Sequence, residues 1–158
     1  MIKIAAGALT AAAIAVPAAI TGLVPGQATA QERTLTLGFA GLMDRRNRED
    51  IPEIVLGVGV NMGEEPIELL SGGYYRMNLT ADGSGEIAVE GPDFFRNIWI
   101  NEIVINQIEI RPMGGIDSIE FDAAGTATIS FIAIRPGQYF LQHRGARGDS
   151  QRVEINIR

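Results

Sequence analysis

The stretch that decides the fold is residues 121–140, FDAAGTATISFIAIRPGQYF, in the last third of the chain. A turn containing Gly125 precedes Thr126–Phe131, in which polar and apolar residues alternate. The pair Pro136-Gly137 then marks a second turn before Gln138–Leu141. Alternation with period two, bounded by glycine and proline, is typical of strands that bury one face. We therefore predict two strands in this stretch.

Further strands are expected on both sides of it. Residues Ser118–Phe121 and Arg152–Ile157 show the same alternation near the C-terminus. Many short strands separated by glycine or proline turns indicate an all-β domain, either a β-sandwich or a barrel. Upstream, we expect strands at residues 34–39, 53–60, 66–70, 74–80 and 86–89.

An isoleucine-rich run, Ile98–Ile110, suits an extended chain that ends at Arg111–Gly115. Its alternation changes phase near Glu102, which suggests a β-bulge. Another pattern, Asp82–Glu86, places oxygen-bearing side chains at alternate positions, as a calcium loop does. Because the further acidic positions of an EF-hand loop are lacking, a hairpin turn is the better interpretation.

The charged run Asp44–Asp50 contains Arg45, Arg46 and Arg48 and has no hydrophobic periodicity. We expect a solvated loop, or at most a short helical turn, ending near Pro52. Three guanidinium groups could grip a carboxylate or a phosphate. The flanking acids nearly cancel their charge, which favours the solvated loop.

The first thirty residues read as a cleavable signal peptide. Lys3 gives a positive start, residues 4–24 are almost wholly apolar, and Ala28-Thr29-Ala30 has the small-x-small pattern of a cleavage site. An uncleaved anchor is the alternative, but Pro17 and Gly22 interrupt the apolar run. We therefore expect signal peptide 1–30, a single domain 31–158, a periplasmic or secreted location, and no membrane span after cleavage.

Composition restricts the chemistry of that domain. The chain has 13 basic and 19 acidic residues, and its only lysine is Lys3, so the expected mature domain has 13 − 1 = 12 arginines and a net charge of 12 − 19 = −7. Nucleic acid is therefore not an expected partner. With no cysteine, one histidine and no recognisable catalytic motif, we expect no enzymatic activity and assign no catalytic residue.

Residues 121–131, followed by 135–140, resemble a cupredoxin, the blue-copper Greek-key β-sandwich. Residues 70–79 are similar to the strand that precedes the first copper ligand of that family. The resemblance covers roughly residues 53–158. It implies a cupredoxin-like fold of Greek-key topology.

The copper chemistry of that family does not carry over. A type 1 site needs two imidazoles and a thiolate, whereas the position matching the cysteine ligand is His143, six residues past Gly137. The resemblance therefore implies a fold without blue copper. His143 could still hold copper in a weak site with Met113 or Met62, since imidazole and thioether both bind copper. The alternative is an ordinary surface or loop-packed histidine.

The densest aromatic patch comprises Phe94, Phe95 and Trp99. If exposed, it would anchor a protein partner; otherwise it plugs one end of the sandwich. The sequence thus predicts a non-catalytic binding or accessory module of an envelope system, with a periplasmic protein partner of unknown identity. The alternative is a copper-handling protein that uses His143 and methionines.

Overall fold

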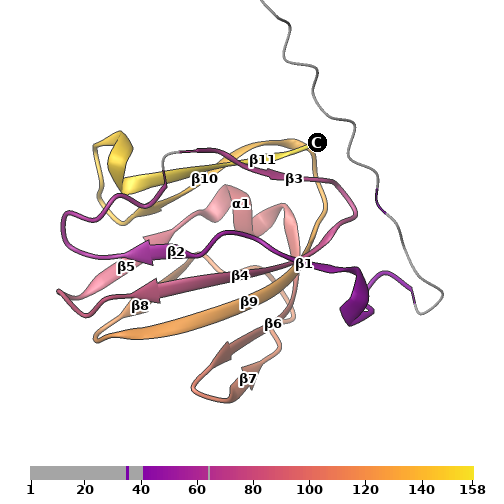
Figure 1. Cartoon of the computed structure of the whole chain (residues 1–158), viewed down its shortest axis with the longest axis horizontal. Coiled ribbons are helices and arrows are strands. Elements are labelled where there is room, and N and C mark those ends of the chain that lie inside the picture. The colour runs from indigo at the N-terminus through magenta and orange to yellow at the C-terminus, as the bar shows by residue number, and fades with distance from the viewer. Residues whose placement is uncertain (1–34, 36–40, 64) are drawn as a thin grey trace, which may run out of the picture. The chain divides into compact units, whose positions relative to one another are not determined.

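The computed structural model describes Leu35 and residues 41–63 and 65–158. These residues form two β-sheets packed face to face, with one short α-helix (Figure 1). The predicted all-β sandwich is therefore confirmed. The predicted signal peptide and nearly all of the strand expected at residues 34–39 lie outside the described residues. Within them, no helix has the length and apolar character needed to cross a membrane.

The first sheet has the order β1-β4-β9-β6-β7, with β2 also paired with β4. β1 and β2 run parallel to β4 and occupy successive parts of the same edge, whereas the other pairs are antiparallel. The strands are β1 (Arg48–Asp50), β2 (Ile54–Leu56), β4 (Tyr74–Ala81), β6 (Ile98–Ile105), β7 (Ile108–Ile110) and β9 (Gly125–Ala133).

The second sheet has the order β3-β11-β10-β5-β8. Here β3 runs parallel to β11, and the other pairs are antiparallel. A 3-10 turn, η2 (Asp149–Gln151), leads into the last strand. The strands are β3 (Ile67–Leu69), β5 (Ile87–Glu90), β8 (Ser118–Phe121), β10 (Gly137–His143) and β11 (Arg152–Ile157).

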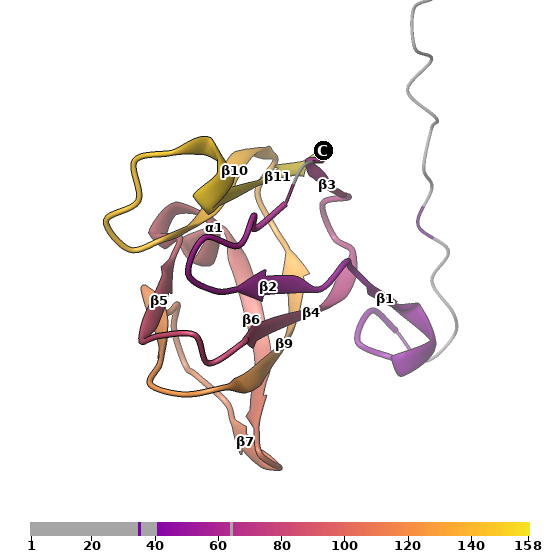
Figure 2. The same cartoon turned by 60° about the vertical axis from the view of Figure 1, so that its left-hand side comes forward.

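The core lies between the two sheets, which face each other in Figure 2. In β4, Met77 and Leu79 are buried, and Asn78 between them points away from the core. β9 does the same with Ala127 and Ile129. This alternation is what the sequence pattern predicted. The two strands predicted at residues 121–140 fall in β9 and β10, one in each sheet.

The charged run at residues 44–50 is more ordered than predicted. A 3-10 turn, η1 (Arg45–Asn47), is capped by Asp44, and β1 follows it directly. Hydrogen bonds from the side chain and backbone of Arg46 lower the pKa of Asp44 to about 2. The expectation of a short helical turn holds for η1, but the end of the run pairs with β4 and is therefore a strand.

The isoleucine-rich run is a hairpin and not one extended strand. Asn106 and Gln107 both have positive φ, 49° and 68°, and turn the chain from β6 into β7. Asn-Gly is the usual sequence at such a turn, so Asn-Gln gave a weaker signal. The predicted bulge is confirmed, because the pairing of β6 with β9 shifts register between Ile100 and Glu102.

A helix that was not predicted changes the interpretation of the aromatic patch. α1 (Pro92–Arg96) has proline in its first turn, where the missing N–H costs nothing. Its Phe94 and Phe95 are both 0% exposed, and Phe94 packs edge-on against Phe131 with ring centroids 5.6 Å apart. These two residues plug the sandwich and do not reach a partner, so the partner-binding prediction is wrong for them. Only Trp99, at 48%, is exposed.

Candidate functional site

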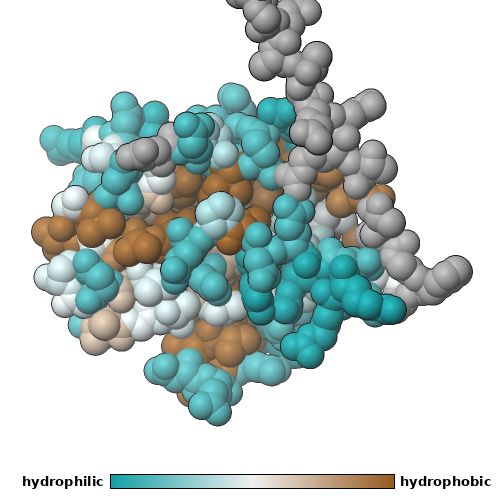
Figure 3. Space-filling model, viewed as in Figure 1, coloured by the Kyte–Doolittle hydropathy of each residue, from teal (hydrophilic) through white to brown (hydrophobic). Residues whose placement is uncertain are grey.

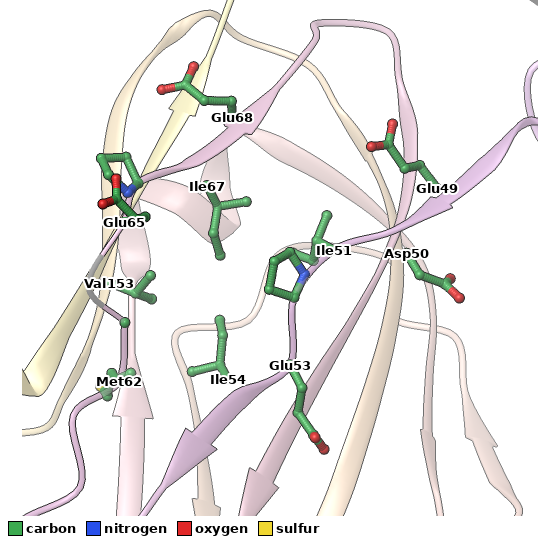
Figure 4. A pocket seen from close by; sticks show the side chains of 13 residues that line it. Glu49, Asp50, Ile51, Glu53, Ile54, Met62, Glu65, Ile67, Glu68 and Val153 are labelled. Carbon is green, nitrogen blue, oxygen red and sulfur yellow. The ribbon is translucent and has the colours of Figure 1, made fainter.

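A groove of about 480 Å³ opens where the edges of the two sheets meet. One wall is formed by residues Glu49–Ile54 of β1, β2 and their connection. The other is formed by Pro66 and the first two residues of β3, Ile67 and Glu68 (Figure 4). Its floor is apolar. The floor side chains are Ile51, Ile54, Met62, Ile67 and Val153, supplied by segments far apart in the sequence.

Carboxylates surround this floor. Figure 4 shows acidic side chains around the periphery, with the isoleucines nearer the centre. In the part of the chain that the structure describes, the lining contains no arginine, lysine or histidine. In Figure 3 a hydrophobic band runs across this region with hydrophilic surface on both sides. The acidic residues are Glu49, Asp50, Glu53, Glu65 and Glu68.

Some of these acids are held in place by neighbours outside the groove. Arg76 forms an ion pair with Asp50, and the Thr80 hydroxyl donates a hydrogen bond to Glu53. On the other wall, Arg158 Nη2 lies 2.9 Å from Glu68 Oε2. These contacts restrain three of the carboxylates of the rim, and the two arginines place positive charge beside them.

Local sequence explains the two-layer arrangement. In β3, Ile67 and Leu69 are buried while Glu68 is directed outward, as successive strand residues must be. Pro52 and Pro66 precede β2 and β3. Proline cannot donate to a sheet ladder and is therefore tolerated at the edges of sheets. The groove itself was not predicted, because no contiguous motif encodes a cavity between two edge strands.

His143 lines a different pocket, of about 280 Å³, together with Glu86, Arg144 and the Gly57–Gly59 turn. The imidazole Nε2 is buried and has no hydrogen-bond partner among the described residues. Burial lowers the pKa of His143, because it disfavours the charged imidazolium. A neutral imidazole with a free nitrogen is a competent metal ligand.

The structure does not bring His143 together with the methionines predicted to accompany it. Met113 is 103% exposed on the connection between β7 and β8, and it does not line the His143 pocket. Met62 is buried in the floor of the groove. A type 1 copper site does not fit the chain, because His143 is its only histidine and it has no cysteine.

Three exposed carboxylates cluster beside this pocket. Oxygens of Glu86, Glu120 and Asp122 lie within 4.8 Å of one another; within the described residues this is the only such group of three or more potential metal ligands, and His143 is not part of it. The pKa of Glu86 is raised, chiefly by its hydrogen bond with Glu120 and also by the charges of Glu120 and Asp122. The preceding residues, Asp82–Gly85, form a turn in which Ser84 N donates to Asp82 Oδ1 at 2.8 Å. It is not the predicted hairpin turn, because β4 and β5 on its two sides belong to different sheets.

The β6–β7 hairpin is the third surface feature. Ile108 and Ile110 are 65% and 45% exposed on the edge strand β7, and Figure 3 shows hydrophobic surface there with hydrophilic atoms at the tip. Arg111 ion-pairs with both Glu102 and Glu109, at 3.1 and 3.2 Å. Short length, charges and the following Pro112 are features that protect edge strands from aggregation.

The sequence matches no protein-family profile and no curated protein. Partial structural similarity extends to copper nitrite reductase from Nitrosomonas europaea (TM-score 0.47, 13% identity, 64% of this chain and 35% of that one). It extends also to a copper-containing nitrite reductase from Thermus scotoductus (TM-score 0.47, 13% identity, 60% of this chain and 22% of that one). A multicopper oxidase from Campylobacter jejuni has a TM-score of 0.44 and 5% identity, over 60% of this chain and 20% of that one. This chain thus covers 20–35% of the length of these three proteins. The two mixed sheets form the predicted β-sandwich.

Proposed function

We propose that this chain is a non-catalytic binding module, exported to the periplasm or secreted, that serves an envelope system by docking a protein partner in the groove between its sheets. The observation that carries the proposal is the pairing of an apolar floor with an acidic rim. Binding sites are typically concave and mostly apolar, with a few polar groups that fix orientation, and a volume of roughly 300–1,000 Å³ is usual. The groove has these properties.

Site-specific photo-crosslinking in the producing cells tests the groove as a docking site. A benzophenone amino acid replaces Glu65, which is exposed at the rim, and in a matched control it replaces Gln138, which is exposed on β10. We expect a discrete adduct from position 65 and none from position 138. Equal labelling at both positions, or none at either, would contradict docking in the groove.

Copper addition tests the expectation that the domain lacks blue copper. Since a type 1 site requires a thiolate and two imidazoles, purified protein should show no blue absorption band and no stoichiometric copper after dialysis. One tightly bound copper per chain would contradict the interpretation that the domain binds no metal.

Metal binding at His143 is the second candidate function. It is favoured by the buried imidazole nitrogen without a hydrogen-bond partner, in a pocket that also contains Glu86. Imidazole and carboxylate together suit Cu(II) or Zn²⁺. Glu86 lines the same pocket as His143 and Met113 does not, so the proposed co-ligand is Glu86 in place of Met113. If copper binds at all, His143→Ala should abolish its affinity and Met113→Ala should leave it unchanged; unchanged affinity in His143→Ala rejects this candidate.

A further inference from the structure

We infer that the groove takes an extended segment of a protein partner in which apolar residues alternate with arginine or lysine. This inference rests on the proposed function and specifies the chemistry of the partner. It draws on three observations about the groove, namely the strands on its two walls, its layering and its charge.

Each wall of the groove belongs to the edge of a sheet. β3 is the terminal strand of the second sheet, and β1 with β2 forms a terminal edge of the first. Edge strands present backbone N–H and C=O groups that can pair with an added strand. Recognition by strand addition obtains affinity from these backbone hydrogen bonds and specificity from alternate side chains. An extended segment therefore suits the walls.

The layering of the groove matches the period of such a segment. In a strand, successive side chains point to opposite faces. One set would meet the apolar lining at Ile51, Pro52 and Pro66, which unlike the buried Ile54, Met62 and Ile67 are at least partly exposed, and the other would lie level with the carboxylates of the rim. The wall from Glu49 to Ile54 is six residues long, which an extended peptide of about the same number of residues would follow, at roughly 3.3 Å per residue.

Charge decides which residues should alternate with the apolar ones. Among the described residues, the lining includes five carboxylates and no basic residue, and two of these carboxylates, Asp50 and Glu68, pair with arginines outside the groove. Acidic partners would be repelled, whereas guanidinium groups can form bidentate hydrogen bonds with carboxylates. Complementary charge of this kind raises association rates and excludes wrong partners. A cationic amphipathic segment is therefore the occupant that satisfies floor, rim and walls together.

Titration calorimetry with synthetic peptides tests the inference on the intact chain. The probe is a capped octapeptide of alternating valine and arginine. The first control has the same composition with all four valines before all four arginines, and the second replaces every arginine by glutamate. We expect the alternating peptide to bind at low ionic strength, the block peptide to bind about tenfold more weakly, and the glutamate peptide not to bind.

Matched variants locate the binding. The groove variant Glu49→Gln/Glu53→Gln/Glu65→Gln removes three rim charges, and the control variant Asp93→Asn/Glu109→Gln/Asp117→Asn removes three exposed charges elsewhere. We expect the groove variant to lose about tenfold in affinity for the alternating peptide and the control variant less than about twofold. Thermal unfolding of both variants establishes that they are folded.

Hydrogen exchange tests the strand geometry. On binding the alternating peptide, amides of β3 or of residues 50–55 should exchange more slowly, because an added strand pairs with one of these edges. Equal losses in the two variants, equal binding of the block peptide, or unchanged exchange at both edges would overturn the inference. Binding of spermidine but of no peptide would also overturn it. A persistent crosslink at position 65 with no peptide binding would refute the cationic segment alone, whereas loss of the crosslink would refute the proposed function.

Discussion

The groove and the Glu86 cluster are two acidic regions of one acidic domain, and they carry their charge in opposite ways. In the groove, five carboxylates are spread around an apolar floor, and two of them pair with Arg76 and Arg158. In the cluster, three carboxylates lie within 4.8 Å of one another, and the pKa of Glu86 is raised as a result.

This difference separates an acidic surface that attracts a cationic partner from one in which neighbouring carboxylates repel one another. Dispersed carboxylates present a negative field to an incoming cation. Crowded carboxylates oppose one another's ionisation, so their mutual repulsion lowers the stability of the fold when they are ionised. Negative charge alone therefore does not identify a binding site. The apolar floor beneath the groove is the feature that distinguishes the two.

The largest expected effect concerns the floor. Ile54 is 1% exposed, so Ile54→Ala should lower the free energy of unfolding by about 2–4 kcal/mol through lost burial and a residual cavity. The control is Val55→Ala on the same strand, at a side chain that is 37% exposed. Urea denaturation measures both. Equal destabilisation by the two substitutions would mean that the floor is not part of the packed core.

A smaller effect is expected in the cluster. The folded-state pKa of Glu86 is raised, so the native protein binds this proton more readily than the unfolded chain, and the repulsion acts on the ionised form at neutral pH. Glu120→Gln should therefore stabilise the protein at pH 7. The advantage should shrink as pH falls through the raised pKa, where Glu86 becomes protonated in the unsubstituted protein.

Denaturation midpoints between pH 4 and pH 7 measure this difference, with Glu109→Gln as the control at an exposed carboxylate outside the cluster. Both substitutions remove an ion pair, Glu120 with Arg144 and Glu109 with Arg111. Only Glu120→Gln also relieves the repulsion on Glu86, so Glu109→Gln should not stabilise. A pH-independent gain in Glu120→Gln would contradict the repulsive account of the cluster.

The smallest effect is expected at the neighbouring pocket. Burial lowers the folded-state pKa of His143 below its usual value near 6.5. The stability that depends on the neutral imidazole is therefore full above pH 6.5 and is lost as pH falls through the lowered pKa. His143→Gln should lose less stability than the unsubstituted protein between pH 7.5 and pH 5. An identical pH profile in the two proteins would show that burial does not govern this titration.

Sequence reasoning found most strands because local alternation reflects local burial. Residues 74–80, 126–131 and 152–157 all alternate, and each lies in a strand whose inner face is buried. The bulge near Glu102 was also readable, since one extra residue shifts the phase of the pattern. Local signals failed at α1 and at the turn Asn106-Gln107. A five-residue helix is too short to show a period, and this turn lacks the usual glycine.

The sequence by itself determined the β-strands, the acidic balance, and the absence from this chain of the cysteine and second histidine that a type 1 copper site requires. Only the tertiary structure decided that Phe94 and Phe95 face inward, that His143 and Met113 do not share a pocket, and that Glu49–Ile54 lies across a groove from β3. The physical reason is the sequence separation of the residues that interact. Alternation records how each strand meets its own environment, whereas a groove between two sheet edges depends on packing between segments that are distant in the chain.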